Sequence, residues 1–515
     1  MPIRWGGTSS GALLLLGLAS SGCGTGGTRG DVGTAGSAAG ESRAGAKGTA
    51  RPDTGEIASG AAASGNLRSE GARSEGAAPG SPSARSSADM ARGGAGATDA
   101  GQAGAGIGSA APSTTDVAAL PSDWVFDEAE LRSYELTLDP AAWETLQQNA
   151  LDEQYAEADL RIDDIFMARV GLRFKGSLGT LASCFADDGT PRCSKLSMKL
   201  KFDEYLPEQR FFGLKRLNFN SMVLDPSLLR ERLAYRLFRE LGIVAPRAVH
   251  ARLSVNGESL GVFSLVEAVD GRFTDDHFVG GDGNLYKEAW PDTDDTDFLD
   301  RHLETNEDLP DHSLLLQFQA ELAAASDEQL PGVVARYLDL DRSWAYLAVD
   351  ESINDWDGPS TFYCYEGSTE CENHNYYLYQ HENEARFTLI PWDLDNTFTR
   401  TTPLDDVPGV FQFPADCTLR YQALGKGVMP PACDPLWRGV ALSDRSGYLG
   451  ALERLLSGPF AAPTVDAWLA DWQAQIEPEV AKDEHGPGLE EFHAALEELA
   501  ISVRELRSRA QAERD

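Results

Sequence analysis

Residues 386–398 read RFTLIPWDLDNTF, an apolar run that predicts a β-strand and is followed at once by Asp393 and Asp395. Two carboxylates at a strand end repel each other unless a cation or a base compensates them. The alternative is a pair of solvated turn residues. The pattern therefore indicates a site for positive charge at the end of this strand.

Two segments upstream extend the pattern. Residues 375–379 predict a second strand headed by Asn375, and residues 333–353 predict a helix followed by Asn354-Asp355-Trp356-Asp357-Gly358. Kinases place a catalytic Asp and two metal ligands around one nucleotide by a similar series of elements: a helix, an acidic loop, a strand headed by Asn and a strand that ends in Asp. Oxygen ligands on short rigid elements also suit Mg²⁺, whose remaining positions go to phosphate oxygens and water.

The preceding residues predict a β-rich half with one main helix. This helix is expected to begin at Pro226, with Asp225 as its cap, and to end at Gly242, and Asn256-Gly257 predicts a hairpin turn. The predicted strands are residues 130–137, two within 161–174, then 195–202, 217–220, 250–255 and 259–266. Helices are predicted at 313–325, 448–456, 465–480 and 489–513, so the sequence predicts an α+β fold with a β-rich and a helix-rich half.

These ordered motifs resemble the spore-coat protein H (CotH) kinases, secreted or surface proteins with an atypical, two-lobed protein-kinase-like fold. The matching stretches are residues 173–177, 195–202, 217–242, 255–270, 284–287 and 354–398. The resemblance covers roughly residues 131–398 and implies ATP-dependent phosphorylation of Ser or Thr on secreted proteins, with Mg²⁺ or Mn²⁺. It implies a β-rich N-lobe over 119–270 and a helical C-lobe over 271–515, whose last helices lie partly or wholly outside the matching stretches.

The resemblance also implies roles for single residues. Asp357 matches the catalytic acidic position, Asn375 and Asp393 match metal-binding positions, and Asp395 is a further metal candidate. The candidates for binding the nucleotide are Lys199, Lys201, Glu231, Glu267 and Lys287. Among them, Lys199 or Lys201 is expected to bind phosphate with Glu231 as its partner, and Lys287 is a third choice. Glu267 is expected near the base or ribose.

The chain departs from the family pattern in two places. The usual Arg-Gly-Asn-Ser-Ser-like turn reads Lys175-Gly176-Ser177-Leu178, which leaves its phosphate contacts open. The segment between Asp357 and Asn375 holds Cys364 and Cys371, and we interpret it as a disulfide-closed loop that contacts substrate.

Other functions remain open from the sequence. The chain could be a catalytically silent kinase-like module used for surface binding or adhesion, because ATP is scarce outside the cytoplasm. Residues 393–397 also match the Asp-x-Asp-x-Thr signature of Asp-based phosphatases and phosphotransferases. In those enzymes the motif opens the domain, whereas here helix-rich sequence is all that follows it, so this alternative is the weaker one.

The charge of the chain narrows its partners. Residues 24–118 carry eight Lys or Arg and nine Asp or Glu, so the net charge of −37 resides in residues 119–515. Nucleic acid is an unfavourable partner for such a surface, because phosphate binding needs basic residues. The negative electrostatic field of this surface would attract a secreted or surface protein substrate of basic character, or divalent cations. The alternative is that the acidic residues only keep an exported protein soluble.

The cysteines indicate an oxidising compartment. Beyond Cys23, six cysteines fall into three local pairs: Cys184 with Cys193, Cys364 with Cys371, and Cys417 with Cys433. An even number in close pairs predicts three short-range disulfides. Zinc binding is the weaker alternative, because no pair has CxxC spacing.

The N-terminus predicts export. Arg4 precedes an apolar run at residues 11–19 that is too short to span a bilayer, and small residues lead to Cys23. This pattern resembles a bacterial lipoprotein signal over residues 1–23, with Cys23 as the lipid anchor, although Ser20 replaces the usual large apolar residue. Secretion without an anchor is the alternative, and a chance apolar start is another. Residues 24–118, rich in Gly, Ala and Ser, predict a disordered tether. We therefore expect an exported protein, either a membrane-anchored lipoprotein (periplasmic or at the cell surface) or a secreted one, with membrane contact only through the anchor.

Overall fold

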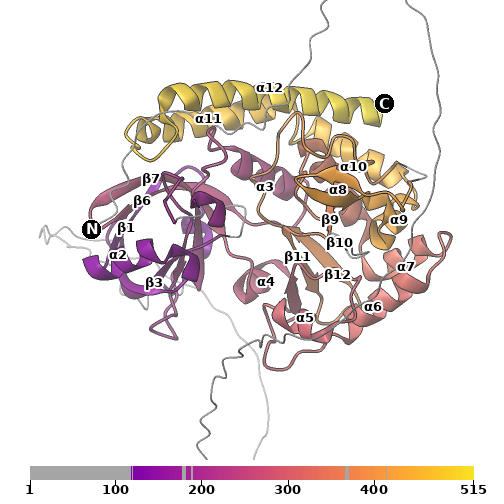
Figure 1. Ribbon diagram of the computed structural model, residues 1–515, viewed down its shortest axis with the longest axis horizontal. Helices are drawn as coiled ribbons and strands as arrows, with labels where there is room; N and C mark the ends of the chain where they lie inside the picture. The colour runs from indigo at the N-terminus through magenta and orange to yellow at the C-terminus, as the bar shows by residue number, and fades with distance from the viewer. Residues whose placement is uncertain (1–116, 119, 177–180, 187–188, 366–370, 413–414) are drawn as a thin grey trace, which may run out of the picture. The chain divides into compact units, whose positions relative to one another are not determined.

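Seven strands close into a barrel in the order β1-β2-β3-β4-β5-β7-β6 (Figure 1). Every neighbouring pair is antiparallel except β1 and β6, whose parallel pairing from Arg132 with Ala251 to Leu136 with Val255 closes the barrel. The strands are β1 Arg132–Thr137, β2 Ala156–Ile162, β3 Ile165–Phe174, β4 Met198–Lys201, β5 Arg216–Asn220, β6 Ala248–Val255 and β7 Glu258–Glu267. In β2 burial alternates, and the buried Ala158, Leu160 and Ile162 belong to the apolar core of the barrel.

The computed structural model describes residues 117–118, 120–176, 181–186, 189–365, 371–412 and 415–515. Residues 1–116 lie outside them, and with these the predicted export signal, the anchor Cys23 and all of the predicted tether except residues 117 and 118. So do Ser177 and Leu178 of the turn that departs from the family pattern. Every residue described below belongs to one compact unit of the chain.

The main helix of the β-rich part begins later than predicted. Helix α3 spans Arg230–Glu240, whereas the sequence predicts a start at Pro226. The carboxylate of Asp225 accepts hydrogen bonds from the backbone amides of Ser227 (3.0 Å) and Arg230 (2.9 Å). Asp225 therefore does satisfy a free amide at the start of the helix, but through an intervening turn that contains Pro226.

The second part combines helices with two small sheets. One sheet has the order β12-β11-β8, with β8 Asn284–Lys287, β11 Tyr376–Gln380 and β12 Phe387–Pro391. The other has the order β10-β9-β14-β13, with β9 Phe362–Cys364, β10 Cys371–Glu372, β13 Tyr421–Ala423 and β14 Lys426–Met429. The sequence predicts the first sheet in part and misses the second.

The helices confirm an α+β fold with a helix-rich second part. They are α2 Pro140–Gln148, α4 Gly271–His277, α5 Thr296–Arg301, α6 Ser313–Ala324, α7 Leu330–Tyr337, α8 Leu340–Ile353, α9 Pro435–Ala441, α10 Ser446–Ser457, α11 Ala462–Val480 and α12 Gly488–Arg514. The single helix predicted over 333–353 is wrong. It divides at Asp339, whose side chain caps α8 by accepting from the amides of Asp341 (3.1 Å) and Arg342 (3.3 Å).

The C-terminal helices contact both parts of the described structure. Figure 1 shows α11 and α12 side by side, with α12 packed on α8 and α10 and α11 against β7. Just after α11, Asp483 forms a buried ion pair with Lys195 (3.2 Å) and accepts a hydrogen bond from the amide of Val262 in β7 (3.1 Å). The last helices therefore connect the barrel to the helical part.

All three predicted disulfides are present: Cys184–Cys193, Cys364–Cys371 and Cys417–Cys433. The second joins β9 to β10 directly, because Cys364 and Cys371 are register partners in that sheet. Among the helices of the described residues, none has both the length and the apolar character needed to cross a membrane.

Candidate active site

A cleft of about 690 Å³ collects most of the residues that the sequence singled out. Its lining comes from the barrel, from α3 and from the β12-β11-β8 sheet. The predicted site residues in this lining are Lys199, Glu231, Lys287, Asp357, Asn375, Asp393 and Asp395. Segments more than 200 residues apart in the sequence thus meet at one place.

Two strand ends deliver Asn375 and Asp393 to the cleft together. The pair Tyr376 and Pro391 ends the ladder between β11 and β12, and the amide of Trp392 donates to the carbonyl of Asn375 (3.2 Å). Asn375 and Asp393 both have positive φ, 63° and 55°, a conformation that Asn and Asp tolerate better than most residues. The backbone amide of Asp393 donates to the hydroxyl of Tyr235 in α3 (3.1 Å). The metal-ligand candidates therefore lie at the same end of one rigid hairpin.

The carboxylate of Asp357 is held by four side chains. Oδ1 accepts from the hydroxyl of Tyr363 (2.7 Å) and contacts Nε2 of His374 (3.0 Å). Oδ2 accepts from the amides of Asn375 (3.1 Å) and Asn396 (3.2 Å). These contacts fix both oxygens on a short loop, and they link that loop to Asn375, the residue just before β11.

His374 is both an orienting and a charged neighbour of Asp357. Its ring stacks on Tyr363, with centroids 5.0 Å apart and planes 11° from parallel. Burial alone would lower the pKa of His374, but its hydrogen bond to Asp357 and the charge of that carboxylate outweigh burial and raise the pKa. A cationic imidazole is thereby favoured beside Asp357.

The loop before Asp357 is anchored by two buried carboxyl groups. Asp350 of α8 accepts from the hydroxyl of Ser360 (3.1 Å), and its carbonyl accepts from the amide of Asp355 (3.1 Å). Burial raises the pKa of Asp350 and of Asp355 well above the ordinary range. Gly358 fits over this pair because a Cβ there would lie 2.6 Å from Oδ2 of Asp355. A side chain at position 358 would therefore displace the loop.

Lys175 is the cation best placed against the acidic groups, and the sequence did not single it out as a site residue. It follows β3, lines the cleft, and donates from Nζ to Oδ1 of Asn220 (2.7 Å). Burial lowers the pKa of Lys175, and the charges of Asp393 and Glu231 oppose that effect. The signal was available, because Lys175 lies inside the matching stretch 173–177.

Lys199 lies in the same cleft among other cations. Burial lowers its pKa to about 7, and the neighbouring Arg216, Arg173 and Lys175 contribute to this decrease. Lys287 also lines the cleft, and its positive charge acts on Asp393. A cluster of cations that repel one another in a half-buried cleft is suited to a ligand with several negative charges.

Glu231 lies in the first turn of α3, where the charge of Lys175 acts on its carboxylate. Its Oε1 accepts from the side-chain amide of Asn220 (2.8 Å), the same residue that holds Lys175. Burial and the charge of Asp393 raise the pKa of Glu231 to about 7. Asn220 therefore couples the lysine at the end of β3 to the carboxylate of α3.

Asp393 and Asp395 lie in a crowded acidic environment. Burial raises the pKa of Asp393 despite the opposing charges of Lys175 and Lys287. Burial, followed by the charges of Asp393 and Glu231, raises the pKa of Asp395 well above its ordinary range. Within the described residues, no group of three or more His, Cys, Asp or Glu is arranged to hold a metal ion by itself. The donors that are present, one amide and carboxylates, fit Mg²⁺ or Mn²⁺ if phosphate oxygens and water complete the shell.

Two predicted residues lie outside the cleft lining. Lys201 pairs with Glu204 (2.8 Å). Glu267 is buried and accepts from the backbone amide (3.1 Å) and Nε (3.0 Å) of Arg247. Its carboxylate is occupied by that arginine, and the next two residues, Ala268 and Val269, line the cleft instead. Glu288 also lines the cleft, and its carboxylate accepts from the backbone amide of Asn375 (3.2 Å), a contact that no motif indicated.

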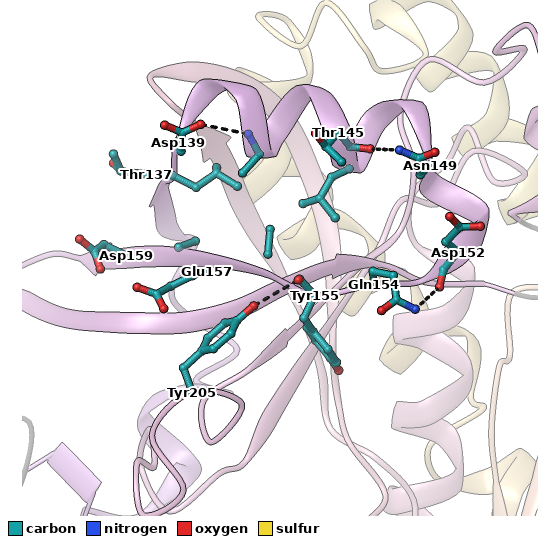
Figure 2. Close-up of a pocket in the computed structure, with 15 residues that line it drawn as sticks. Thr137, Asp139, Thr145, Asn149, Asp152, Gln154, Tyr155, Glu157, Asp159 and Tyr205 are labelled. Atoms are coloured by element: carbon teal, nitrogen blue, oxygen red, sulfur yellow. Dashed lines mark hydrogen bonds between the residues drawn. The ribbon is translucent and has the colours of Figure 1, made fainter. Parts of the chain in front are cut away.

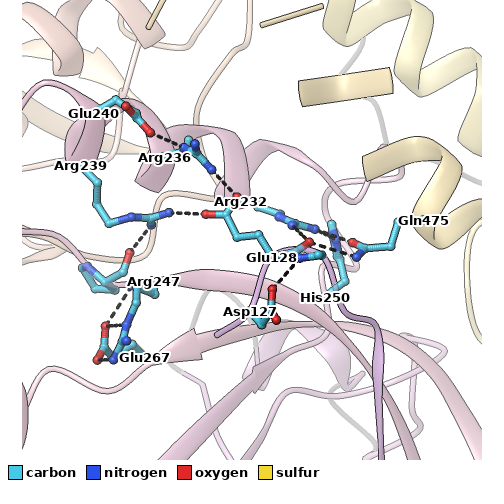
Figure 3. A network of polar contacts seen from close by, with 12 residues as sticks. Asp127, Glu128, Arg232, Arg236, Arg239, Glu240, Arg247, His250, Glu267 and Gln475 are labelled. Carbon is cyan, nitrogen blue, oxygen red and sulfur yellow. Dashed lines mark hydrogen bonds and ion pairs between the residues drawn. The ribbon is translucent and has the colours of Figure 1, made fainter. Parts of the chain in front are cut away.

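A polar network formed by the arginines of α3 fixes this helix (Figure 3). Arg232 donates to Gln475 of α11 (2.9 Å), contacts Nδ1 of His250 in β6 (2.8 Å), and donates to the carbonyl of Glu128 (3.0 Å). Arg239 donates to the carboxylate of Glu128 (2.9 Å). The position of α3, and with it Glu231, therefore depends on the segment before β1, on β6 and on α11.

Comparison with known proteins gives one family. The family model described as "CotH kinase protein" matches residues 172–510, more than half of the chain. The match begins inside β3 and extends into α12, so it includes the C-terminal helices that the motif resemblance left aside.

The similar proteins include two relatives and one solved structure. Inner spore coat protein H of Bacillus subtilis is 27% identical over 204 residues, which cover 37% of this chain and 52% of that protein. The inner spore coat protein H-like protein of the same organism is 35% identical over 72 residues, 14% of this chain and 22% of that protein. The chain thus spans about half of the first relative's length. The Helicobacter pylori proinflammatory kinase CtkA has 11% identity and a TM-score of 0.23, over 64% of this chain and 93% of that one, and this low score carries no structural argument.

Proposed function

The chain belongs to the CotH kinase family, and from this premise we propose that it transfers the γ-phosphoryl group of ATP to Ser or Thr hydroxyls of exported proteins. Membership of the family supports a kinase-type function. The observation that carries the finer proposal is the convergence of Asp357, Asn375, Asp393 and Lys175 on one cleft. These are the residue types that phosphoryl transfer requires: a base, two oxygen ligands and a phosphate-binding cation.

Asp357 would act as the base. In the proposed step, the substrate hydroxyl oxygen bonds to the γ-phosphorus, the bond to the β-phosphate oxygen breaks, ADP leaves, and the hydroxyl proton passes to Asp357. The hydrogen bonds from Tyr363 and Asn396 hold the carboxylate in one orientation, so little reorganisation is needed. A positioned acid–base group contributes about 10²–10⁴-fold to rate.

The lysines of the cleft would bind the phosphates. Lys175 is pre-positioned by Asn220, and Lys287 and Lys199 line the same cleft. Asn375 and Asp393 would hold the divalent cation, with Asp395 beside them. A bound Mg²⁺ or Mn²⁺ neutralises charge on the transferring phosphoryl group.

The three disulfides favour a second candidate function. Disulfides persist in oxidising compartments, where ATP is scarce. A kinase-like module that binds a surface partner without catalysis would fit such a location. Export, with or without lipidation at Cys23, remains part of the proposal for either function.

Incubation of the purified chain with labelled ATP tests the proposal, with Mg²⁺ and Mn²⁺ supplied separately. We expect label on protein Ser or Thr in the wild type and none with Asp357→Asn. Asp164→Asn is the matched control, since Asp164 is exposed in the β2–β3 turn and does not line the cleft. Labelling that persists in Asp357→Asn would contradict the assigned base, and nucleotide binding without labelling in the wild type would favour the silent module.

A further inference from the structure

A second groove, of about 740 Å³, lies on the barrel between α2 and β2 (Figure 2). Its apolar floor includes Leu146 of α2 and Ala158 of β2, which are 7% and 2% exposed. In Figure 2, Thr145 and Asn149 mark the side of α2, and Glu157 and Asp159 mark the side of β2. The groove shares no lining residue with the active-site cleft.

The walls of this groove carry charge of one sign. Asp139, Asp152, Glu157 and Asp159 line it, and among the described residues no Lys, Arg or His does. Asp139 caps α2, and Arg169 pairs with Glu157 (3.1 Å) from outside the lining. Asp152 is exposed. The groove therefore keeps an excess of negative charge above an apolar floor.

The groove reaches the lip of the active-site cleft. Asp152, Gln154 and Tyr155 line the groove, while Glu153, between them in sequence, lines the cleft and pairs with Arg173. One short segment therefore separates the two depressions. A chain lying along the groove would have one end near the catalytic cleft.

We propose that this groove binds a basic, extended peptide segment of the protein substrate and thereby docks it for phosphorylation. The apolar floor accommodates alternate side chains of such a segment, and the acidic walls meet the Lys or Arg side chains between them. Tyr205 adds an aromatic ring to the lining, a surface on which cations are favourably placed. The lining takes in Ala156 to Asp159 of β2, about 13 Å of extended chain, so a strand-like segment of about four residues fits along this part of the groove.

The substrate role rests on the proposed kinase function, but the groove itself can be tested without nucleotide. The probe is a short fluorescent peptide that alternates Arg and Leu and contains one Ser, compared with the same peptide carrying Gln for Arg. Anisotropy with the full chain should show binding of the Arg peptide and much weaker binding of the Gln peptide. Binding should weaken as salt increases, because the partners are exposed charges.

Three variants locate the binding site. The double variant Asp152→Lys with Glu157→Lys reverses two exposed charges of the groove and should weaken binding of the Arg peptide about tenfold. Ala142→Trp fills the groove without changing its charge and should also weaken binding of the Arg peptide. Asp164→Lys makes one of the same charge changes on the same hairpin, outside the groove, and should leave binding unchanged. If Asp164→Lys weakens binding as much per reversed charge as the double variant does, and Ala142→Trp has no effect, the acidic chain attracts the peptide non-specifically, and this result would overturn the docking site.

Kinetics separate failure of the docking site from failure of the kinase. With the Arg peptide as substrate, the groove variants should raise KM for peptide while kcat and KM for ATP stay unchanged. Peptide binding without phosphorylation by the wild type would leave the groove in place and refute the kinase. Phosphorylation with the same peptide KM in wild type and groove variants would refute the groove and leave the kinase.

Discussion

The side-chain amide of Asn375 donates to both the carbonyl (2.9 Å) and the carboxylate (3.1 Å) of Asp357. This one amide joins the loop after α8 to the start of β11. If Asn375 also offers its oxygen to a cation, the same side chain sets the distance between the proposed base and the proposed metal. The first prediction follows from this double contact.

Asn375→Ala should reduce kcat for peptide phosphorylation by about 10²-fold or more, since Asp357 loses two hydrogen bonds and its fixed orientation. The free energy of unfolding should change by about 1–2 kcal/mol, because Asn375 is only half-buried. Steady-state kinetics and urea unfolding give the two values. Thr388→Ala on β12 is a control for general loosening of the same sheet, and an equal loss of kcat there would remove the specific role of Asn375.

Asp393→Asn should abolish stabilisation of the chain by Mg²⁺ and ATP together. In the wild type, nucleotide at about 100 times its Kd should raise the free energy of unfolding by about 2.7 kcal/mol. A thermal melt measures this as an increase in Tm that requires both ATP and the metal. Lys201→Met serves as the matched control, because Lys201 lies outside the cleft, and it should retain the increase. An unchanged increase in Asp393→Asn would exclude Asp393 as a ligand.

His250 should make the fold sensitive to acid. Burial, and then the charge of Arg232, lowers the pKa of His250 from 6.5 to about 3, with Lys195 as a further cationic neighbour. The unfolded chain therefore binds a proton between these values while the folded chain does not. The stability from neutral His250 is fully present above pH 6.5 and is lost as pH decreases toward 3. In urea unfolding at a series of pH values, His250→Gln should make the acid-induced decrease in the free energy of unfolding smaller by several kcal/mol. The exposed His493→Gln should leave it unchanged.

Asp483→Ala should destabilise the chain by about 3–5 kcal/mol, because it leaves Lys195 as an unpaired buried cation and frees the amide of Val262. Lys482→Ala, at the residue next to Asp483, removes a surface ion pair with Glu479 and should cost less than about 1 kcal/mol. Chemical unfolding of both variants tests the difference. Similar values for the two would mean that the C-terminal helices are not held to the barrel through this pair.

Gly358→Ala should impair catalysis more than binding of nucleotide. The new Cβ would overlap Oδ2 of Asp355, so the loop carrying Asp357 would move. We expect a decrease in kcat with little change in KM for ATP, measured in the same peptide assay. Gly332→Ala, where the added Cβ meets nothing within 4 Å, is the control.

The sequence predicted much of the site because the relevant residues lie next to regular elements. The strand before Asp393 and the strand after Asn375 have clear apolar patterns, and strand ends place side chains reliably. The glycine turn at Asn256-Gly257 is likewise formed, between β6 and β7. The cysteines pair as predicted, since close spacing leaves few alternatives.

Other features depend on contacts that no local pattern records. Barrel closure pairs β1 with β6 across more than a hundred residues, and neither strand shows its partner in its own sequence. Glu267 was expected at the nucleotide, but Arg247 occupies it from twenty residues away. Lys175 is placed in the cleft by its hydrogen bond to Asn220, 45 residues away, which its own stretch of sequence does not show. The start of α3 was wrong because a turn around Pro226 competes with the helix.

The pairing of Lys195 with Asp483 has a consequence for biogenesis. The two residues are 288 positions apart, so the ribosome produces the lysine long before its counter-ion. Until residue 483 has been made, Nζ of Lys195 can donate to the carbonyl of Val262 but has no carboxylate beside it. A chain cut short before residue 483 is therefore expected to stay partly open and to be removed by proteases, so only full-length molecules accumulate.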